Sequence, residues 1–237
     1  FIVAVKAFHG KTMGSLSMMG KADYRVPPGV LYGGPVYHVP FGDADAVEKQ
    51  LEICEKVGIG VAAVMFEPIQ GESGAIVPPD DFWPRIREAT LKYDTLLIAD
   101  EVQTGLGRTG KLFAHQWEDV RPDMVIIAKA LSGGYYPISA VLADKEVLGV
   151  FKPGDHGSTF GGNPLAAAVA RAALRVIVDE RLVERSAELG DYFLAEREIP
   201  WWAIALSIVA AETSTLTIIS IPGLAYDTNL GFLQLVL

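Results

Sequence analysis

The stretch that decides the fold is TLLIADE, residues 95–101, in which an apolar run of strand length ends in two adjacent carboxylates. Two similar runs flank it: VAAVMF (61–66), which ends before Glu67, and MVIIA (124–128), which ends before Lys129. Strands that are apolar throughout and separated by helices indicate a mostly parallel sheet covered on both faces. Ligands of such folds bind just beyond the carboxyl ends of the strands. We therefore expect the charged residues at these ends to share one site.

Helical patterns separate the apolar runs and complete an α/β fold. Asp43 is suited to cap the first predicted helix, and Pro164 to open the last one. ISAVLA (138–143) predicts a fourth buried strand, and the opening residues 1–10 predict another. The predicted helices span residues 43–57, 81–93 and 164–195.

Composition excludes several classes of protein. The 237 residues carry 20 basic and 29 acidic side chains, a net charge of −9, with no basic block. Nucleic-acid binding needs clustered Lys and Arg, so no nucleic-acid partner is expected. The single cysteine argues against a disulfide scaffold and a cysteine-based zinc site, and we predict no metal site. No secretory signal is apparent, so a cytoplasmic location is expected.

The charge distribution divides the chain into two unlike parts. All basic residues lie at or before Arg197, and we predict a large domain over 1–198 followed by an atypical apolar tail over 199–237. The uncharged run 199–211 has 13 residues, short of the roughly 20 that a membrane span needs. The tail is either an alternative strand-rich ending or the product of a shifted reading frame. We favour the frame shift because the composition changes abruptly.

Asp100 and Lys129 are the first candidates for chemistry. A carboxylate after a buried strand needs a partner, which a helix N-terminus or a structural ion pair would also supply. A lysine at a strand end can simply extend to solvent. If it is desolvated, its pKa falls, and a neutral amine can attack a carbonyl to form a Schiff base. Gly133 and Gly134 would allow close approach of a ligand.

Other functions were weighed against this chemistry. GKT (10–12) ends like a phosphate loop, so Lys11 and Asp100 could serve a nucleoside triphosphatase. Such a loop needs a glycine at position 5, where valine stands, and no glycine lies between. A serine hydrolase lacks its G-x-S-x-G motif here. A binding module without catalysis remains an alternative, although charges at several strand ends favour catalysis.

At these residues the sequence resembles the class III, pyridoxal-phosphate-dependent aminotransferases, from residue 1 to about 200. The resemblance implies the large domain of the pyridoxal 5'-phosphate (PLP)-dependent transferase fold type I. It rests on five blocks in the family's order: FHGKT (8–12), FEPIQGESG (66–74), LLIADEVQTGLGRTGKLFA (96–114), PDMVIIAKALSGG (122–134) and HGSTFGGNPLA (156–166).

The resemblance implies a role for each matching residue. Lys129 would carry PLP as an internal aldimine and then shuttle a proton. Asp100 would pair with the pyridine nitrogen and keep it protonated, which makes the ring an electron sink. The other implied cofactor contacts are Phe8 and Val102 on the two ring faces, Gln103 at the phenolic oxygen, His9 beside them, and Ser158 and Thr159. Thr159, with Ser158 beside it, would reach the phosphate in the neighbouring subunit, so the resemblance implies a homodimer with shared sites.

The implied substrates are an amine donor and a 2-oxo acid acceptor such as 2-oxoglutarate. Residues 130–143 and 149–177 look most like ornithine aminotransferases, and Glu72 matches the glutamate with which those enzymes mask an arginine. Residues 36–47 are closer to putrescine and other diamine aminotransferases. Lys11 stands where ornithine enzymes usually have an arginine for the donor's α-carboxylate, and lysine lacks the bidentate fork. We favour ornithine and keep putrescine as the alternative.

The sequence also departs from the family pattern. The phosphate-cradling helix start that precedes FHGKT in the family is absent, and the tail contains no arginine to bind a substrate carboxylate. We therefore expect the chain as given to be a fragment that binds PLP weakly or not at all.

Overall fold

The computed structural model describes residues 1–25 and 35–195; the side chains of Arg25 and of residues 189–195 lie outside this description. The residues up to Glu188 form one compact unit. The predicted domain boundary after residue 198 and the proposed origins of the tail lie outside the described residues.

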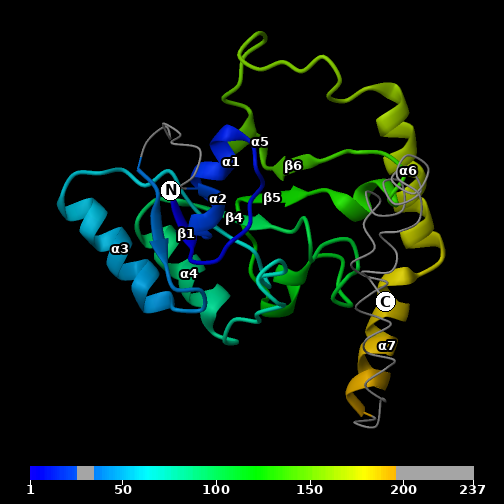
Figure 1. The fold of residues 1–237 in the computed structure, drawn as a ribbon, viewed down its shortest axis with the longest axis horizontal. Helices are drawn as coiled ribbons and strands as arrows, with labels where there is room; N and C mark the ends of the chain where they lie inside the picture. Colours follow the sequence, from blue (N-terminus) through cyan, green and yellow to red (C-terminus); the bar gives the residue numbers. More distant parts are fainter. Residues whose placement is uncertain (26–34, 196–237) are drawn as a thin grey trace, which may run out of the picture. The chain divides into compact units, whose positions relative to one another are not determined.

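The described part of the chain contains one six-stranded sheet (Figure 1). Neighbours from β2 to β5 are parallel, and β6 is antiparallel to β5. The mostly parallel sheet predicted from the apolar runs is confirmed. In the order in which they pair, the strands are β2 (Tyr37–Val39), β1 (Ile2–Ala4), β3 (Ala63–Phe66), β4 (Leu96–Asp100), β5 (Met124–Ile127) and β6 (Ala140–Ala143).

The helices begin where the sequence supplies caps. The Asp43 side chain accepts a hydrogen bond from the Ala46 N–H at 2.9 Å, and Asn163 accepts from Ala166 at 2.9 Å ahead of Pro164. The helices are α1 (Met13–Ser17), α2 (Ala22–Arg25), α3 (Ala44–Lys56), α4 (Phe82–Lys92), α5 (Lys145–Leu148), α6 (Pro164–Asp179) and α7 (Leu182–Ala195), with 3-10 turns η1 (Ala114–Glu118) and η2 (Lys129–Ser132). Among these described helices, none has the length and apolarity that crossing a membrane requires.

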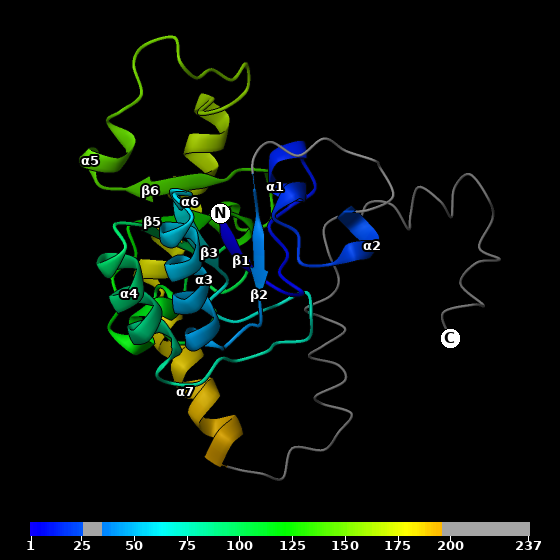
Figure 2. The same ribbon diagram turned by 90° about the vertical axis from the view of Figure 1, so that its left-hand side faces the viewer.

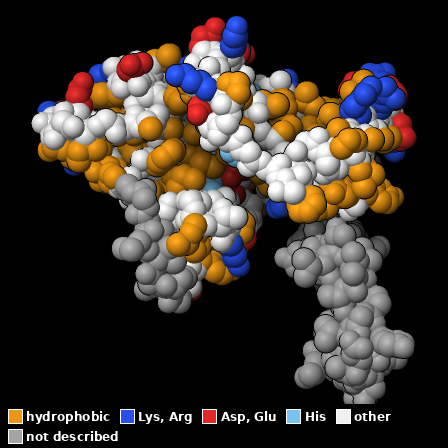
Figure 3. Space-filling model, turned by 90° about the horizontal axis from the view of Figure 1, so that it is seen from above, with side chains coloured by type: hydrophobic (Ala, Val, Ile, Leu, Met, Phe, Trp, Pro, Cys, Tyr) orange, Lys and Arg blue, Asp and Glu red, His pale blue; other side chains and the backbone are white. Residues whose placement is uncertain are grey.

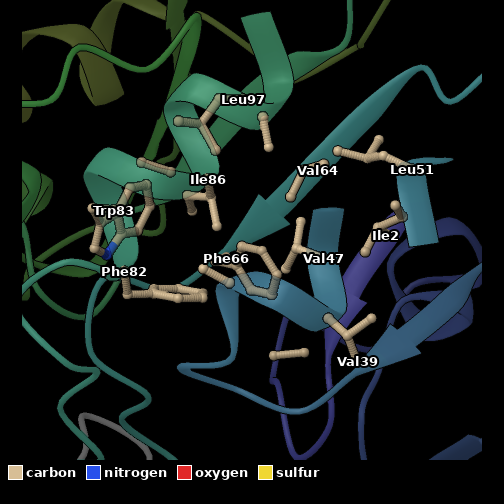
Figure 4. Close-up of a cluster of buried hydrophobic side chains, with 14 of the residues drawn as sticks. Ile2, Val39, Val47, Leu51, Val64, Phe66, Phe82, Trp83, Ile86 and Leu97 are labelled. Atoms are coloured by element: carbon tan, nitrogen blue, oxygen red, sulfur yellow. The ribbon is translucent and has the colours of Figure 1, made fainter. Parts of the chain in front are cut away.

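The largest buried cluster lies between the sheet and the helices α3 and α4, which pack side by side (Figure 2). Alternate residues of β3 face it: Val64 and Phe66 point into this cluster, whereas Ala63 and Met65 belong to a cluster on the opposite face. Figure 4 shows Phe66 beside Phe82 of α4, and their ring centroids are 5.3 Å apart. Burying each such ring contributes about 1.5–3 kcal/mol.

The structure corrects two details of the sequence prediction. The helix predicted over 164–195 is two helices, because the chain breaks at Arg181, whose φ of 52° lies in the left-handed region. Strand β2 was not predicted, since its three residues are too few to show a period. The strand predicted over 138–143 exists over Ala140–Ala143, but it is not buried as predicted, because it lies at the edge of the described sheet and Val141 and Leu142 are exposed.

Candidate active site

The register of the strands brings the predicted charged residues to one edge of the sheet. Phe66 pairs with Ala99 and Asp100 with Ile126, so Glu67 follows β3 at the level of Asp100. Lys129 follows two residues after β5. The carboxyl ends of three neighbouring parallel strands therefore meet where the sequence predicted a site.

Asp100 is the last residue of β4 and is 5 % exposed. One oxygen, Oδ2, lies 2.8 Å from Nδ1 of His9, and the other accepts the Val102 N–H at 3.2 Å. The His9 side chain is completely buried, and its Nε2 has no hydrogen-bond partner among the described residues. Since a carboxylate is the acceptor, His9 Nδ1 carries the hydrogen. His9 is the structural partner that the buried Asp100 carboxylate requires. The hydrogen bond between them orients this carboxylate at the end of β4.

Lys129 opens the turn η2 with a φ of 45°, in the left-handed region that side-chain-bearing residues rarely occupy. Its Nζ donates a hydrogen bond to Oε1 of Gln103, on the turn that follows β4. Both side chains are exposed, and Val102 between Asp100 and Gln103 is half-buried. The structure brings Lys129 and Gln103 together. Among the described residues, Lys129 is not desolvated.

The loop after β1 carries the predicted aromatic residue. Phe8 donates its N–H to Glu67 at 3.1 Å, and its ring meets Tyr24 edge-on with centroids 6.4 Å apart. The Lys11 ammonium lies 4.0 Å from the centroid of the same Tyr24 ring. Among the described residues, no ion pair or hydrogen bond joins Lys11 to Asp100. The Lys11 side chain is therefore held against an aromatic ring by a cation–π contact.

Glu72 forms an ion pair with Lys21, a residue that the sequence analysis did not select. Both side chains are partly exposed, so the pair adds little to stability. Lys21 thus pairs with Glu72 where the family resemblance implied an arginine.

Ser158 and Thr159 lie on a segment whose residues 151–162 are all exposed. The Ser158 hydroxyl accepts the Gly161 N–H at 2.9 Å, a local contact. Within the described part of the chain, no hydrogen bond joins these two residues to Lys129, Gln103 or Asp100. The structure therefore brings together the predicted residues that follow β1, β4 and β5. It does not bring Ser158 and Thr159 to them.

Two further buried carboxylates, Glu67 and Glu101, support the site. Burial raises the pKa of Glu67, which accepts the N–H groups of Phe8 and Gly71. Burial alone would also raise the pKa of Glu101, but hydrogen bonds from His115 and Thr104 outweigh it and hold that pKa below the ordinary value. The sequence places Glu67 and Glu101 at strand ends but does not indicate a role for either residue. Sequence reasoning could not find His115, because nothing in the sequence links it to a carboxylate 14 positions away.

The residues present fit PLP. The cofactor requires a carboxylate for its pyridine nitrogen, an amine for its aldehyde and an aromatic side chain beside its ring. Asp100, Lys129 and Phe8 supply these three groups on neighbouring strand ends. The unpaired Nε2 of His9 faces no described partner, and His9 itself holds Asp100 in place.

Comparison with known proteins assigns the family. The sequence model for "Aminotransferase class-III" matches residues 1–198. The chain belongs to this family. Mitochondrial ornithine aminotransferase of Arabidopsis thaliana is 56 % identical over 184 residues, covering 78 % of this chain and 38 % of the relative. Ornithine aminotransferase 2 of Staphylococcus saprophyticus is 53 % identical over 191 residues, covering 81 % and 46 %.

Solved structures of this aminotransferase family share the fold. Ornithine aminotransferase from Toxoplasma gondii has a TM-score of 0.76 and 41 % identity, covering 81 % of this chain and 44 % of that structure. In another structure of the Toxoplasma enzyme, PLP partially occupies the active site. The described residues therefore have the PLP-dependent transferase fold of type I, and the chain spans less than half the length of these relatives.

Glu101 provides a test of the buried network beneath the site. Because its pKa is lowered in the folded protein, its contribution to stability is present above the ordinary value of 4.5 and is lost as pH falls through the folded value. We expect Glu101→Gln to lower the free energy of unfolding at pH 7 by about 3 kcal/mol. Urea unfolding at about pH 7, 5 and 3 should show a smaller loss on acidification in the variant than in the parent chain.

The exposed Glu55 of α3 is the matched control. Glu55→Gln should leave both the free energy of unfolding and its change with pH as they are in the parent chain. An equal loss on acidification in the parent and Glu101→Gln would contradict the role given to Glu101.

Proposed function

We propose that this chain is the PLP-binding part of an aminotransferase that moves the terminal amino group of ornithine to a 2-oxo acid such as 2-oxoglutarate. The observation that carries the proposal is the meeting of the buried His9–Asp100 pair with Lys129 at one sheet edge. The ornithine aminotransferases among its relatives support the choice of donor.

The proposed chemistry divides between the cofactor and the chain. When bound, PLP supplies an electrophilic aldehyde and an electron-accepting ring. Asp100 would hold the protonated pyridine nitrogen of PLP, and His9 orients that carboxylate. The Lys129 amine would hold PLP at its aldehyde carbon and would move a proton at the reacting carbon of the donor. Gln103, which contacts Lys129, would hold the phenolic oxygen.

The donor end of the site is proposed from two cations. Lys11 offers a positive charge to the α-carboxylate of ornithine, and Lys21 neutralises Glu72 when no substrate amine is present. Putrescine has two amines and no carboxylate, so it would not use Lys11. This difference separates the two donors chemically.

The cytoplasmic location expected from the sequence stays a prediction.

We propose that two copies of the chain associate and that Thr159 serves the partner's site. The segment 151–162 is exposed throughout, and Phe160 and Tyr135 are 80 % and 90 % exposed. Figure 3 shows hydrophobic side chains exposed over the face of the molecule seen from above. Large exposed aromatic side chains are typical of association surfaces.

Labelling tests the cofactor assignment. We expect the chain, incubated with enough PLP to overcome the weak binding expected of a fragment and then reduced with borohydride, to carry a phosphopyridoxyl group on Lys129, because this amine lies at the strand ends beside Asp100. Peptide mapping by mass spectrometry locates the group. Lys129→Ala should abolish specific labelling, whereas Lys111→Ala, which removes an exposed lysine stacked on Trp117, should retain it. Specific labelling of another lysine would refute the assignment.

A donor assay requires the flanking segments, so we would join residues 1–198 to those of the Staphylococcus saprophyticus relative. We expect a higher kcat/KM with ornithine than with putrescine. Lys11→Ala should lower kcat/KM about tenfold for ornithine and leave it unchanged for putrescine. Putrescine has no carboxylate that could contact Lys11. A preference for putrescine would overturn the donor, and equal losses with both amines would refute the role of Lys11.

Sedimentation velocity tests the proposed association. We expect a dimer whose dissociation constant rises about tenfold or more in Phe160→Asp, because the substitution buries a charge in an apolar contact. Val57→Asp, which places the same charge at an exposed apolar position at the end of α3, should not change it. A monomeric parent chain at all concentrations would speak against the shared site.

A further inference from the structure

Glu67 joins two loops that the sequence does not connect. It follows β3, and its carboxylate accepts the Phe8 N–H at 3.1 Å through Oε2 and the Gly71 N–H at 3.3 Å through Oε1. Phe8 lies 59 positions away along the chain. The loop after β1 and the turn after β3 are therefore held together by the two oxygens of one side chain.

Each of these two loops carries or supports a residue of the candidate site. Phe8 presents the aromatic ring. Gly71 packs so closely under Gln103 that a Cβ at residue 71 would stand 2.7 Å from Cγ of Gln103. Gln103 in turn contacts the Lys129 amine. A shift of the turn at Gly71 would therefore move the side chain that orients the lysine.

The buried environment of Glu67 is unfavourable for a carboxylate unless its hydrogen bonds to the two loops compensate for the burial. The residue is 6 % exposed; burial raises its pKa, and the nearby Asp100 charge raises it further. The two backbone N–H donors and His9 act in the opposite direction. An apolar side chain would avoid the desolvation penalty but would leave both N–H groups without their acceptor.

We propose that Glu67 is a positioning residue that sets Phe8 and, through Gly71, Gln103 against Lys129. Its effect on the cofactor rests on the proposed function, whereas the bridge between the loops does not. Two properties are required of it. The side chain must be long enough to reach both loops, and both of its terminal atoms must accept hydrogen bonds.

Two variants separate these properties. Glu67→Gln keeps the length but turns one acceptor into a donor that faces a backbone N–H. Glu67→Asp keeps both acceptors and the charge but is one methylene shorter. The exposed Glu55 again supplies the control, Glu55→Gln.

Hydrogen exchange of the cofactor-free chain tests the bridge. We expect at least one of the two amides, that of Phe8 or that of Gly71, to exchange about 10- to 100-fold faster in Glu67→Gln, the ratio that corresponds to one lost hydrogen bond to a charged group. Glu55→Gln should leave both unchanged. Unchanged exchange at both amides in Glu67→Gln would overturn the proposal. If Glu67→Gln lacks the parent's circular dichroism, Glu67→Asp is measured instead, and unfolding of both would also overturn it.

Borohydride labelling with PLP tests the consequence for the site. We expect Glu67→Gln to need about tenfold more PLP for half-maximal labelling of Lys129, and Glu67→Asp to lie between it and the parent. Faster exchange with unchanged labelling would refute the effect on Gln103 and Lys129. If the parent chain itself takes no label, the proposed function fails in this chain, and the exchange data alone decide the bridge.

Discussion

The structure depends on the burial of acidic side chains at the carboxyl edge of a parallel sheet. Asp100 ends a strand that is buried on both faces, so its charge requires a partner from another part of the chain. His9 supplies it, from a loop 91 positions earlier. The same contact that makes the fold tolerate the charge also fixes the orientation of the carboxylate at the end of β4.

The neighbouring carboxylates extend this arrangement. Glu67 binds the loops that follow β1 and β3, and Glu101 binds the turn after β4 to the helical turn that contains His115. Loops at strand ends have few apolar contacts, and buried hydrogen bonds to charged groups hold them more firmly than surface contacts would. The ion pair between Glu72 and Lys21 is more exposed and correspondingly easier to open.

The fold was largely predictable because its signals are local. Apolar runs of four to six residues, the cap at Asp43 and the proline at the start of α6 each depend on adjacent residues. The prediction of one helix over 164–195 was wrong. The helix breaks at Arg181 through a left-handed backbone conformation, and no glycine or proline in the sequence marks this position. The sequence pattern does not predict the short strand β2, because its strand conformation depends on pairing with β1.

The sequence by itself determined the family, the parallel sheet and the position of Asp100 and Lys129 at strand ends, since each follows from motif order and apolar patterning. Only the tertiary structure decided the partners: His9 for Asp100, Gln103 for Lys129, Lys21 for Glu72, and the two loops that share Glu67. These contacts join residues up to 91 positions apart. Their geometry depends on strand order and register, which bring distant segments to the same edge only after the sheet has formed.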